Sequence, residues 1–424
     1  MYVRLSNFFS NNDALYKLQF GFRPNHSTTS ALINCIEAIQ KALDSGNFAC
    51  SVLIDLQKAF DTVDHNILFA KLEYYGIRGI ALSWFVSFLS SRKQFVSISG
   101  FSSSSKIMFH GVPQGSILGP LLFLIYINDL HEAIPFSTVN LFADDTMLFN
   151  QNPSLKSLTN KTNIDLKCLC NWLNANLISL NSTKTEIILF RPKRNATNYD
   201  ARFKLNGKRL YPSKVVKYLG VLIDEKLNWS SHIDFVCNKL KRANGALSKI
   251  RHYVPKDVLL SIYYALFHSH MSYSSLVWAQ HQNAITRRVL TLQKNALRLI
   301  SFSEFNAPSS PFLSFFDLIK FLNVILIHQL LNHKLPLPLC TSFDLDSLSL
   351  HARLNRYPSR AKSGILQLPR VSSVCFGNYS IRYQSILSWN LLQNFLAIDD
   401  ISTLSLNRLK FFVKFYFLST YHQM

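Results

Sequence analysis

Apolar and polar positions in the first part of the chain predict short, regular elements. In residues 28–44 apolar side chains recur three or four positions apart, which predicts a helix with one buried face. Residues 49–54 are apolar apart from Ser51 and lead directly into Asp55, which is typical of a buried strand. Asp64 is a suitable N-cap for a helix that follows it.

The next segments predict a helix over residues 80–90 and then a hairpin. One strand is expected over residues 94–99, the serines of 102–105 are expected at the tip, and the return strand is expected to pass through Ile107 and Phe109. Serine favours turns because its hydroxyl can bond to the local backbone.

Three further stretches complete the pattern. The apolar residues 117–130 predict a buried helix, and residues 139–149 form two apolar runs around two adjacent aspartates, which predicts a hairpin with an acidic tip. Residues 163–180 predict a helix whose leucines, up to Leu177, lie on one face. Helical patterns also dominate after residue 230, so the expected fold class is α+β with an added helical region.

Charge is distributed unevenly along the 424 residues. Residues 1–150 hold 10 basic and 11 acidic side chains, whereas residues 151–424 hold 35 and 13. The net charges of the two segments are therefore −1 and +22, within a total of +21. A near-neutral half followed by a basic half predicts a metal-dependent site beside a surface that binds a polyanion, although a basic face can also serve only solubility.

Two classes of protein are disfavoured. No apolar run reaches the roughly 18 residues that span a bilayer, and no signal-peptide pattern occurs, so we expect an intracellular protein with no membrane partner. The seven cysteines are irregularly spaced and include no C-x-x-C pair, which argues against a disulfide framework or a zinc knuckle. Cys168 and Cys170 are a conceivable metal pair, but core cysteines are the commoner case.

Asp55 and the pair Asp144-Asp145 are the candidate catalytic residues. Asp55 would end a strand and the pair would occupy a hairpin tip, so two neighbouring sheet elements would bring the carboxylates together. Each position alone is also explained by a cap or by a turn that favours Asp. Adjacent like charges are costly unless a cation neutralises them, so the combination favours a site for Mg²⁺, with Mn²⁺ as the alternative ion.

Six segments resemble, in order, the fingers motif, motifs A, B, C and D, and the strand before the thumb in reverse transcriptases of non-LTR retrotransposons. These segments are residues 19–28 (QFGFRPNHST), 53–65 (LIDLQKAFDTVDH), 111–116 (GVPQGS) with 118–120 (LGP), 142–145 (FADD), 180–185 (LNSTKT) and 217–220 (KYLG). Later segments, residues 263–278 and 292–300, are similar to the thumb of jockey- or CR1-type elements, and residues 368–370 with 388–390 to their closing segment. The resemblance covers nearly the whole chain, and three such motifs in this order are very specific.

The resemblance implies a right-hand polymerase and a role for each matched residue. The expected parts are partial fingers (1–48), a palm (49–229), a mainly helical thumb (230–335) and a C-terminal segment (336–424). Two metal ions would be held by Asp55, Asp144, Asp145 and the carbonyl oxygen of Leu56. Lys184 would protonate the leaving pyrophosphate, with a solvated surface lysine as the alternative.

Substrate contacts are implied in the same way. Phe60 falls where the family places the aromatic that excludes a ribose 2′-hydroxyl, with a core aromatic as the alternative. Gln114 and Gly115 would lie beside the incoming nucleotide, and Arg23 would touch the template or the triphosphate. The thumb would contact the duplex through a basic cluster made of Lys239, Lys241, Arg242, Lys249 and Arg251.

The implied activity is RNA-directed DNA synthesis in retrotransposition. Its partners would be template RNA, a DNA primer, the RNA–DNA duplex and deoxynucleoside triphosphates, in a ribonucleoprotein of nucleus and cytoplasm. Elements of this type usually carry an endonuclease and more of the fingers, so we expect an N-terminally truncated chain. A catalytically defective nucleic-acid-binding relic is the alternative, and a metal-dependent nuclease is a more distant one. Residues 191–194 (RPKR) are a nuclear import signal or, more simply, a basic loop.

Overall fold

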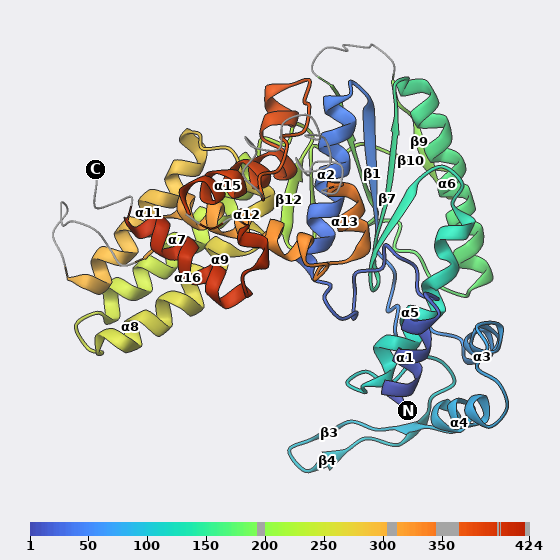
Figure 1. Ribbon diagram of the computed structural model, residues 1–424. Coiled ribbons are helices and arrows are strands. Elements are labelled where there is room, and N and C mark those ends of the chain that lie inside the picture. Colours follow the sequence, from blue (N-terminus) through green and yellow to red (C-terminus); the bar gives the residue numbers. More distant parts are fainter. Residues whose placement is uncertain (193–199, 303–311, 345–363, 397, 399, 420–424) are drawn as a thin grey trace. The chain divides into compact units, whose positions relative to one another are not determined.

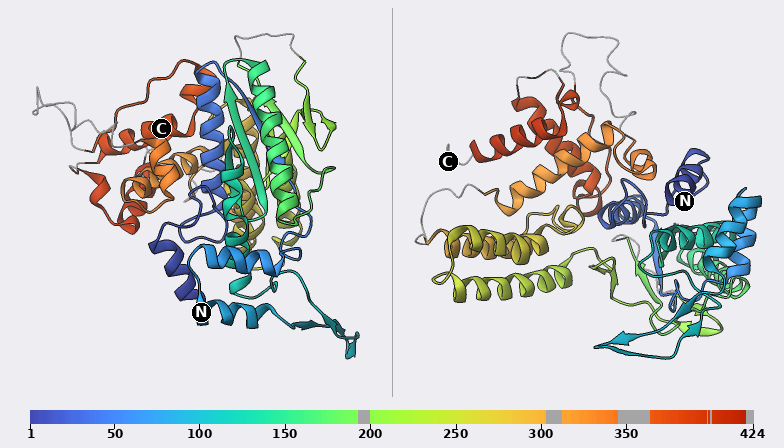
Figure 2. Two further views of the ribbon diagram at one scale, coloured as in Figure 1. Left: turned by 90° about the vertical axis from the view of Figure 1, so that its right-hand side faces the viewer. Right: turned by 90° about the horizontal axis from the view of Figure 1, so that it is seen from below.

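The computed structural model describes residues 1–192, 200–302, 312–344, 364–396, 398 and 400–419. The chain divides into two compact units. Unit 1 comprises Met1–Ser27, Asn47–Leu189 and Lys193–Ser213, and unit 2 comprises Thr28–Gly46, Phe190–Pro192 and Lys214–Met424. Unit 1 contains the main sheet and unit 2 is mainly helical (Figure 1, Figure 2). The predicted α+β class with an added helical region is confirmed.

A four-stranded sheet forms the centre of unit 1, with the strand order β6-β7-β1-β8. The strands are β1 (Phe48–Ile54), β6 (Thr138–Phe142), β7 (Asp145–Asn152) and β8 (Glu186–Phe190). β7 pairs antiparallel with both β6 and β1. Every residue of β1 is buried, because this inner strand is almost entirely apolar. The predicted strand and the predicted acidic hairpin are therefore confirmed.

The short helices of unit 1 include the three that the sequence pattern predicts. The short helices are α1 (Tyr2–Asn11), α3 (His65–Tyr74), α4 (Gly79–Leu89), α5 (Leu118–Ile127) and the 3-10 helix η1 (Asn128–Ala133). The predicted three are α3, α4 and α5. Asp64 caps α3 as predicted, because its carboxylate accepts hydrogen bonds from the backbone N–H groups of Asn66 and Ile67. α5 is buried along almost its whole length, as its apolar sequence predicts.

Helix α6 (Leu155–Ala175) packs on β1 and β7 and corrects one prediction (Figure 1). It begins well before residue 163, because the Ser154 hydroxyl accepts a hydrogen bond from the Ser157 N–H and caps the helix. It also ends before Leu177, which has a left-handed backbone (φ 53°) and is 59% exposed. Leu177 therefore does not continue the buried leucine face.

The predicted hairpin after α4 exists, but its tip was misplaced. β2 (Lys93–Gln94) pairs with β5 (Lys106–Ile107), and β3 (Ser97–Ile98) pairs with β4 (Phe101–Ser102). The turn is Ser99-Gly100, with φ values of 50° and 86°. Two successive positive φ angles match the right-handed twist of paired strands. The serines at 102–105 therefore belong to the return side, where the prediction was wrong.

Unit 2 begins in the sequence with α2 (Thr28–Asp44), which has the predicted bounds. A two-stranded sheet of β11 (Val215–Tyr218) and β12 (Val221–Asp224) then leads into α7 (Ser230–Ile250). The later elements are α8 (Lys256–Ile262), the π-helix η2 (Tyr263–His268), α9 (Ser269–Ser272), α10 (Ser275–Trp278), α11 (Ala284–Ser301), α12 (Phe315–Leu331), α13 (Leu337–Phe343), η5 (Val374–Asn378), α15 (Ile381–Phe395), η6 (Ile401–Thr403) and α16 (Leu406–Ser419). Unit 1 also holds the small hairpin of β9 (Phe203–Leu205) and β10 (Lys208–Leu210).

Acidic side chains of α2 hold the C-terminal segment of unit 2. Glu37 Oε1 accepts a hydrogen bond from the Arg382 backbone N–H at 2.6 Å. The Asp44 carboxylate accepts from the backbone N–H groups of Ser372 and Ser373. α2 is thus grouped with unit 2, whereas the sequence placed it in a fingers segment over residues 1–48. The four-part functional division stays a prediction.

The remaining sequence predictions concern thiols, membranes and the RPKR segment. All seven cysteines are free thiols, and Cys170 is buried and Cys168 half-buried, in keeping with core positions. None of the helices in the described parts of the chain has the length and apolar character needed to cross a bilayer. Residues 193–194 of RPKR lie outside the described residues, so the proposed import signal is not tested.

Candidate functional site

Three carboxylates lie at one end of the main sheet. Asp55 directly follows β1, and Asp144-Asp145 lies at the turn between β6 and β7. Ile54 pairs with Thr146 across the β1–β7 ladder, so Asp55 follows its strand next to the start of β7. The turn is tight, because Phe142 pairs with Asp145 and Ala143 adopts a left-handed backbone with φ of 54°.

The electrostatics of this end of the sheet reflect crowded negative charge. Asp145 keeps part of its surface open to solvent, yet its pKa is raised to about 6. Partial burial of the carboxyl group is the main cause, followed by the charges of Asp144 and Asp55. The charges of Asp144 and Asp55 therefore add to the effect of burial on Asp145, and a bound cation would relieve this repulsion.

Two side chains outside the acidic set already engage Asp55. Asn181 Nδ2 donates to Asp55 Oδ2 at 2.8 Å, and its backbone N–H donates to the Asp55 carbonyl at 2.9 Å. The exposed Lys184 ammonium lies 4.0 Å from the same Oδ2 atom. Lys184 was expected at the site, whereas Asn181 was missed. Its only signal in the sequence was its place in the LNSTKT segment.

The acidic donor set fits a hard cation, although the side chains are not gathered around one. Among the described residues, no group of three or more His, Cys, Asp or Glu side chains is arranged to hold a metal ion. Carboxylate oxygens at the ends of rigid strands are nonetheless the ligands that Mg²⁺ prefers. Leu56, whose carbonyl was the expected fourth donor, is buried and bridges to Leu180.

The GVPQGS loop, residues 111–116, is bonded to the segment that follows Asp55. The N–H groups of Val112 and Gly111 donate to the carbonyls of Phe60 and Val63, both at 2.8 Å. Gln114 Nε2 donates to Asp61 Oδ1 at 2.8 Å, a contact not foreseen from the sequence. A Cβ atom on Gly111, at φ of 89°, would lie 2.9 Å from the Asp61 carbonyl oxygen, so only glycine fits this contact. The loop that carries Gln114 and Gly115 is thus bonded to the segment that carries Phe60.

The Phe60 ring is only partly buried in the core. It stacks on Phe123 of α5 with centroids 4.4 Å apart and meets the exposed Phe22 edge-on at 6.2 Å. The side chain is half-buried, so part of it remains accessible to solvent. This arrangement is compatible with both interpretations of Phe60, as a core aromatic and as a contact to a sugar.

Gln19 is a further positioning residue that the sequence did not single out. Its buried Oε1 accepts hydrogen bonds from the N–H groups of Gly21 and Ala143, at 2.8 and 3.0 Å. A Cβ atom on Gly21 would lie 2.4 Å from the Ala143 nitrogen, so the two segments approach as closely as glycine allows. Gln19 therefore anchors the backbone next to Asp144. Arg23, expected at the substrate, instead donates to the Tyr16 carbonyl at 2.9 Å.

Comparison with known proteins decides the family. The model of the family "Reverse transcriptase (RNA-dependent DNA polymerase)" matches residues 1–223, more than half of the 424 residues. The chain belongs to this family. The resemblance to non-LTR elements is confirmed by the similar curated proteins as well.

Three of these relatives come from Drosophila melanogaster. The RNA-directed DNA polymerase from mobile element jockey is 28% identical, with 68% of this chain and 32% of the relative covered. The probable RNA-directed DNA polymerases from transposon BS and transposon X-element are 26% and 27% identical, and the matches cover 70% and 67% of this chain and 34% and 32% of those proteins. The chain thus spans about a third of the length of the curated relatives it matches.

The similar solved structures are more distant. Telomerase from Candida albicans, in complex with a fragment of telomeric RNA, has a TM-score of 0.36 at 11% identity, over 71% of this chain and 54% of that one. Apo telomerase from Candida tropicalis has a TM-score of 0.39 at 13% identity, over 71% and 49%. Likeness this weak carries no argument about function.

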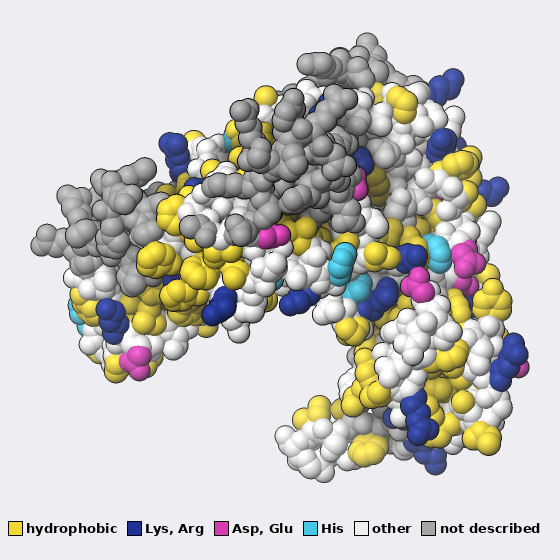
Figure 3. All heavy atoms as spheres, in the orientation of Figure 1, with side chains coloured by type: hydrophobic (Ala, Val, Ile, Leu, Met, Phe, Trp, Pro, Cys, Tyr) yellow, Lys and Arg dark blue, Asp and Glu magenta, His cyan; other side chains and the backbone are white. Residues whose placement is uncertain are grey.

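The expected thumb residues of this reverse transcriptase family member lie on two faces of α7. Lys239, Arg242 and Lys249 are three and seven positions apart, which places them along one face of the helix. Lys241 and Arg251 line a pocket on another face. On the side of the molecule drawn in Figure 3, Lys and Arg side chains are scattered rather than joined in one patch.

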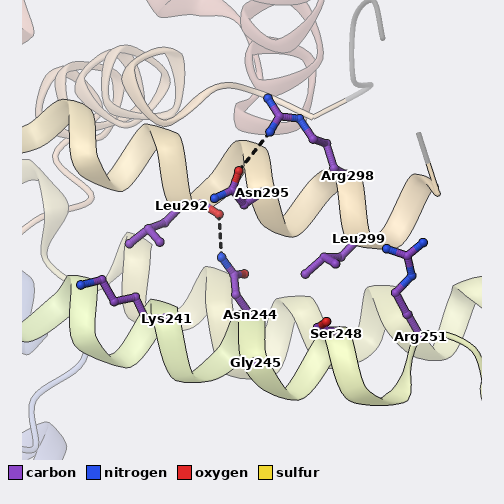
Figure 4. Close-up of a pocket in the computed structure, with 9 residues that line it drawn as sticks. All are labelled: Lys241, Asn244, Gly245, Ser248, Arg251, Leu292, Asn295, Arg298 and Leu299. Atoms are coloured by element: carbon purple, nitrogen blue, oxygen red, sulfur yellow. Dashed lines mark hydrogen bonds between the residues drawn. The ribbon is translucent and has the colours of Figure 1, made fainter. Parts of the chain in front are cut away.

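The pocket lies between α7 and α11 and measures about 480 Å³ (Figure 4). It is lined by Lys241 of α7, Arg251 just after α7 and Arg298 of α11, and Arg298 Nη1 donates to Asn295 Oδ1 at 3.1 Å. Asn244 Nδ2 donates to the Leu292 carbonyl at 3.0 Å, while the buried Asn244 Oδ1 has no partner in the described structure. Cations and amide groups in one open pocket suit phosphate and sugar oxygens.

The KYLG segment and α7 line a second pocket, of about 250 Å³. Lys217, Lys239 and His270 contribute its basic groups. His232 closes the pocket with a side chain that is almost fully buried, and its Nδ1 accepts a hydrogen bond from the Leu222 N–H at 3.2 Å. The imidazole is therefore neutral with its proton on Nε2, and burial lowers its pKa to about 4.

His232 should make the stability of the chain sensitive to mild acid. Its pKa is about 4 in the native chain but about 6.5 when unfolded, so the unfolded state binds the proton first as the pH falls. The free energy of unfolding should drop by about 2 kcal/mol between pH 7.5 and 5, and the loss should level off below pH 4. Urea denaturation followed by Trp fluorescence reports on this region, because Trp278 packs edge-on against His232.

The matched comparison uses His232→Gln and the exposed His252→Gln. Over the same pH interval the free energy of unfolding should fall by about 2 kcal/mol less in His232→Gln than in the native chain. In His252→Gln it should fall as it does in the native chain. Equal pH dependence in His232→Gln and the native chain would show that His232 has the same pKa in the folded and unfolded states, and would contradict the prediction.

Proposed function

We propose that this chain carries out RNA-directed DNA synthesis, in which deoxynucleotides are added to the 3′-hydroxyl of a DNA primer on an RNA template. The observation that carries the proposal is the convergence of Asp55, Asp144 and Asp145 at one end of the sheet, with the GVPQGS loop bonded beside them. The family membership and the printed descriptions of the relatives support it. Retrotransposition is the process in which we propose that it acts.

Two Mg²⁺ ions, with Mn²⁺ as the alternative, would be held by Asp55, Asp144, Asp145 and the Leu56 carbonyl. Such ions activate the attacking hydroxyl and stabilise the charge of the leaving pyrophosphate. The raised pKa of Asp145 supports this proposal, because burial and then the charges of Asp144 and Asp55 oppose its ionisation, and a bound cation would offset both. Asn181 would orient the Asp55 carboxylate through its direct hydrogen bond.

The other roles follow from contacts around the carboxylates. We propose that Lys184, 4.0 Å from Asp55, donates a proton to the pyrophosphate. Gln114, held by Asp61, and the exposed Gly115 would flank the incoming deoxynucleotide. Arg23 would contact the template or triphosphate only after leaving the Tyr16 carbonyl, so its role is the least supported.

The proposed functional parts are partial fingers (1–48), palm (49–229), thumb (230–335) and a C-terminal segment (336–424). The thumb would hold the RNA–DNA duplex through Lys239, Lys241, Arg242, Lys249 and Arg251. We also propose that the chain acts as a ribonucleoprotein in the nucleus and cytoplasm.

Primer extension tests the proposal directly. Purified chain, an annealed DNA primer on an RNA template, Mg²⁺ and deoxynucleotides should give extended primer, and EDTA should stop it. Absence of product together with retained duplex binding would contradict the proposal and favour a nucleic-acid-binding relic.

Phe60 provides a test of sugar selection. Phe60→Ala should raise ribonucleotide incorporation relative to deoxynucleotide incorporation by roughly 10- to 200-fold, the range for removing one steric contact in a pocket. Phe22→Ala is the matched control, because its ring touches Phe60 but is exposed. Steady-state incorporation of both nucleotide types measures the ratio. An unchanged ratio with lowered stability would assign Phe60 to the core.

A further inference from the structure

Residues 90–107 form an arm that is exposed throughout. It contains the hairpin of β2, β3, β4 and β5, and every residue in it is exposed to solvent. The hairpin projects beyond α4 (Figure 1, Figure 2). An isolated two-stranded hairpin is only marginally stable in water, so an arm of this kind gains order when it binds a partner.

The arm exposes large apolar side chains in unusual number. Phe101 is 84% exposed, Ile98 69% and Phe95 59%, and Phe109 at the base of the arm is 73% exposed. Ile98 and Phe101 pair directly across β3 and β4, so they share one face. Clustered exposed apolar groups mark interaction surfaces, because they are costly to leave in water.

Charge narrows the choice of partner. No Asp or Glu occurs between Glu73 and Asp129, whereas Arg92, Lys93 and Lys106 lie in or beside the hairpin. The projecting arm in the lower part of Figure 3 shows hydrophobic side chains and no acidic ones on the face drawn. Exposed aromatic rings among cations, with no acidic side chain, suit the bases and phosphates of an unpaired strand.

A preformed stack leads from α4 into the arm. The Trp84 and Phe88 rings lie 5.4 Å apart with planes 7° from parallel, and the Arg92 guanidinium carbon lies 5.4 Å from the Phe88 centroid. Trp84 is 39% exposed. Parallel planar groups of this kind offer a surface on which a base can continue the stack.

We propose that the arm, together with its flanking aromatic residues, binds unpaired nucleotides of single-stranded RNA. The whole segment, residues 84–109, is here named the stacking arm. Phe95, Phe101 and Phe109 stack on bases, and the three cations contact the phosphates between them. Binding is tolerant of sequence, because every base has a π-face. The choice of RNA over DNA rests on the proposed RNA-directed synthesis.

Fluorescence anisotropy with the full chain tests the stacking arm. The probes are one labelled single-stranded RNA of mixed sequence, the same sequence as single-stranded DNA, and an RNA–DNA duplex, all at one salt concentration. The double variant Phe95→Ala/Phe101→Ala should weaken single-stranded RNA binding about 25-fold, or roughly fivefold for each lost stack. Duplex affinity should stay within about twofold.

Val96→Ala/Ile98→Ala is the matched control, because it removes exposed apolar side chains from the same hairpin without removing a ring. It should leave RNA affinity unchanged within about twofold. An equal loss in the control, an unchanged affinity in the double variant, or an equal loss on the duplex would each overturn the proposal. A loss confined to single-stranded DNA would overturn the choice of RNA.

Two outcomes separate this inference from the proposed function. A chain that binds single-stranded RNA through Phe95 and Phe101 but extends no primer supports the stacking arm and contradicts only the polymerase proposal. A chain that extends primers yet binds RNA equally well with both rings removed overturns only the stacking arm. Trp84→Ala serves as a second variant, with an expected loss of roughly fivefold on single-stranded RNA.

Discussion

Replacing Asp144 by Asn should abolish primer extension while leaving duplex binding nearly intact. The substitution keeps the size and shape of the side chain but removes a full negative charge from the acidic end of the sheet. Losing a principal ligand removes several kcal/mol of charge stabilisation, so the rate should fall at least about 1,000-fold. Extension rates and duplex affinity without nucleotide are the two measurements.

Asp13→Asn is the matched control for this prediction. It is the same isosteric change in unit 1, at an exposed residue whose ion pair with Lys17 is of little energetic consequence. A second readout does not depend on activity. Mg²⁺ should raise the thermal midpoint of the native chain and of Asp13→Asn, and it should raise the midpoint of Asp144→Asn by less. Full activity in Asp144→Asn would remove Asp144 from the proposed mechanism.

The parts of the site that lie at the ends of local patterns were predictable from the sequence. An apolar run that stops at Asp55 and two apolar runs around Asp144-Asp145 already specify a strand end and a hairpin tip. Their meeting required only that β1 and β7 be neighbours, which the pairing of Ile54 with Thr146 bears out. The pattern of apolar residues was therefore enough to predict strands β1, β6 and β7 of the main sheet.

The residues that support the carboxylates were not predictable in this way. Asn181 reaches Asp55 across 126 positions of sequence, and Gln19 reaches Ala143 across 124. Neither contact leaves a local trace, because it depends on which segments the fold brings together. Matched motifs pointed to the segments but not to these side chains.

The misplaced hairpin tip has a different cause, since two local signals compete there. A run of serines and the pair Ser99-Gly100 are both turn-formers. The turn forms at Ser99-Gly100 because these residues adopt the two positive φ angles that a tight hairpin needs. In α6 the prediction missed the Ser154 N-cap and therefore placed the start of the helix too late.

Replacing Lys241 and Arg242 together by Ala should weaken binding to an RNA–DNA duplex and flatten its salt dependence. Residues 151–424 carry a net charge of +22, so we expect them to supply most of the duplex affinity, with little sequence preference. Each lost phosphate contact should lower the log–log slope of affinity against salt by roughly one unit, or about two for the pair.

The single variants Lys241→Ala and Arg242→Ala then show which face of α7 contacts the duplex. Lys241 lines the pocket shared with α11, whereas Arg242 lies on the face with Lys239 and Lys249. Arg408→Ala/Lys410→Ala removes the same charge from exposed positions on α16 and is the matched control. A general field effect would lower affinity equally in both double variants, because only net charge would matter. A contact effect lowers the salt slope only in the α7 variants. An unchanged slope there would leave α7 as a solvated basic face.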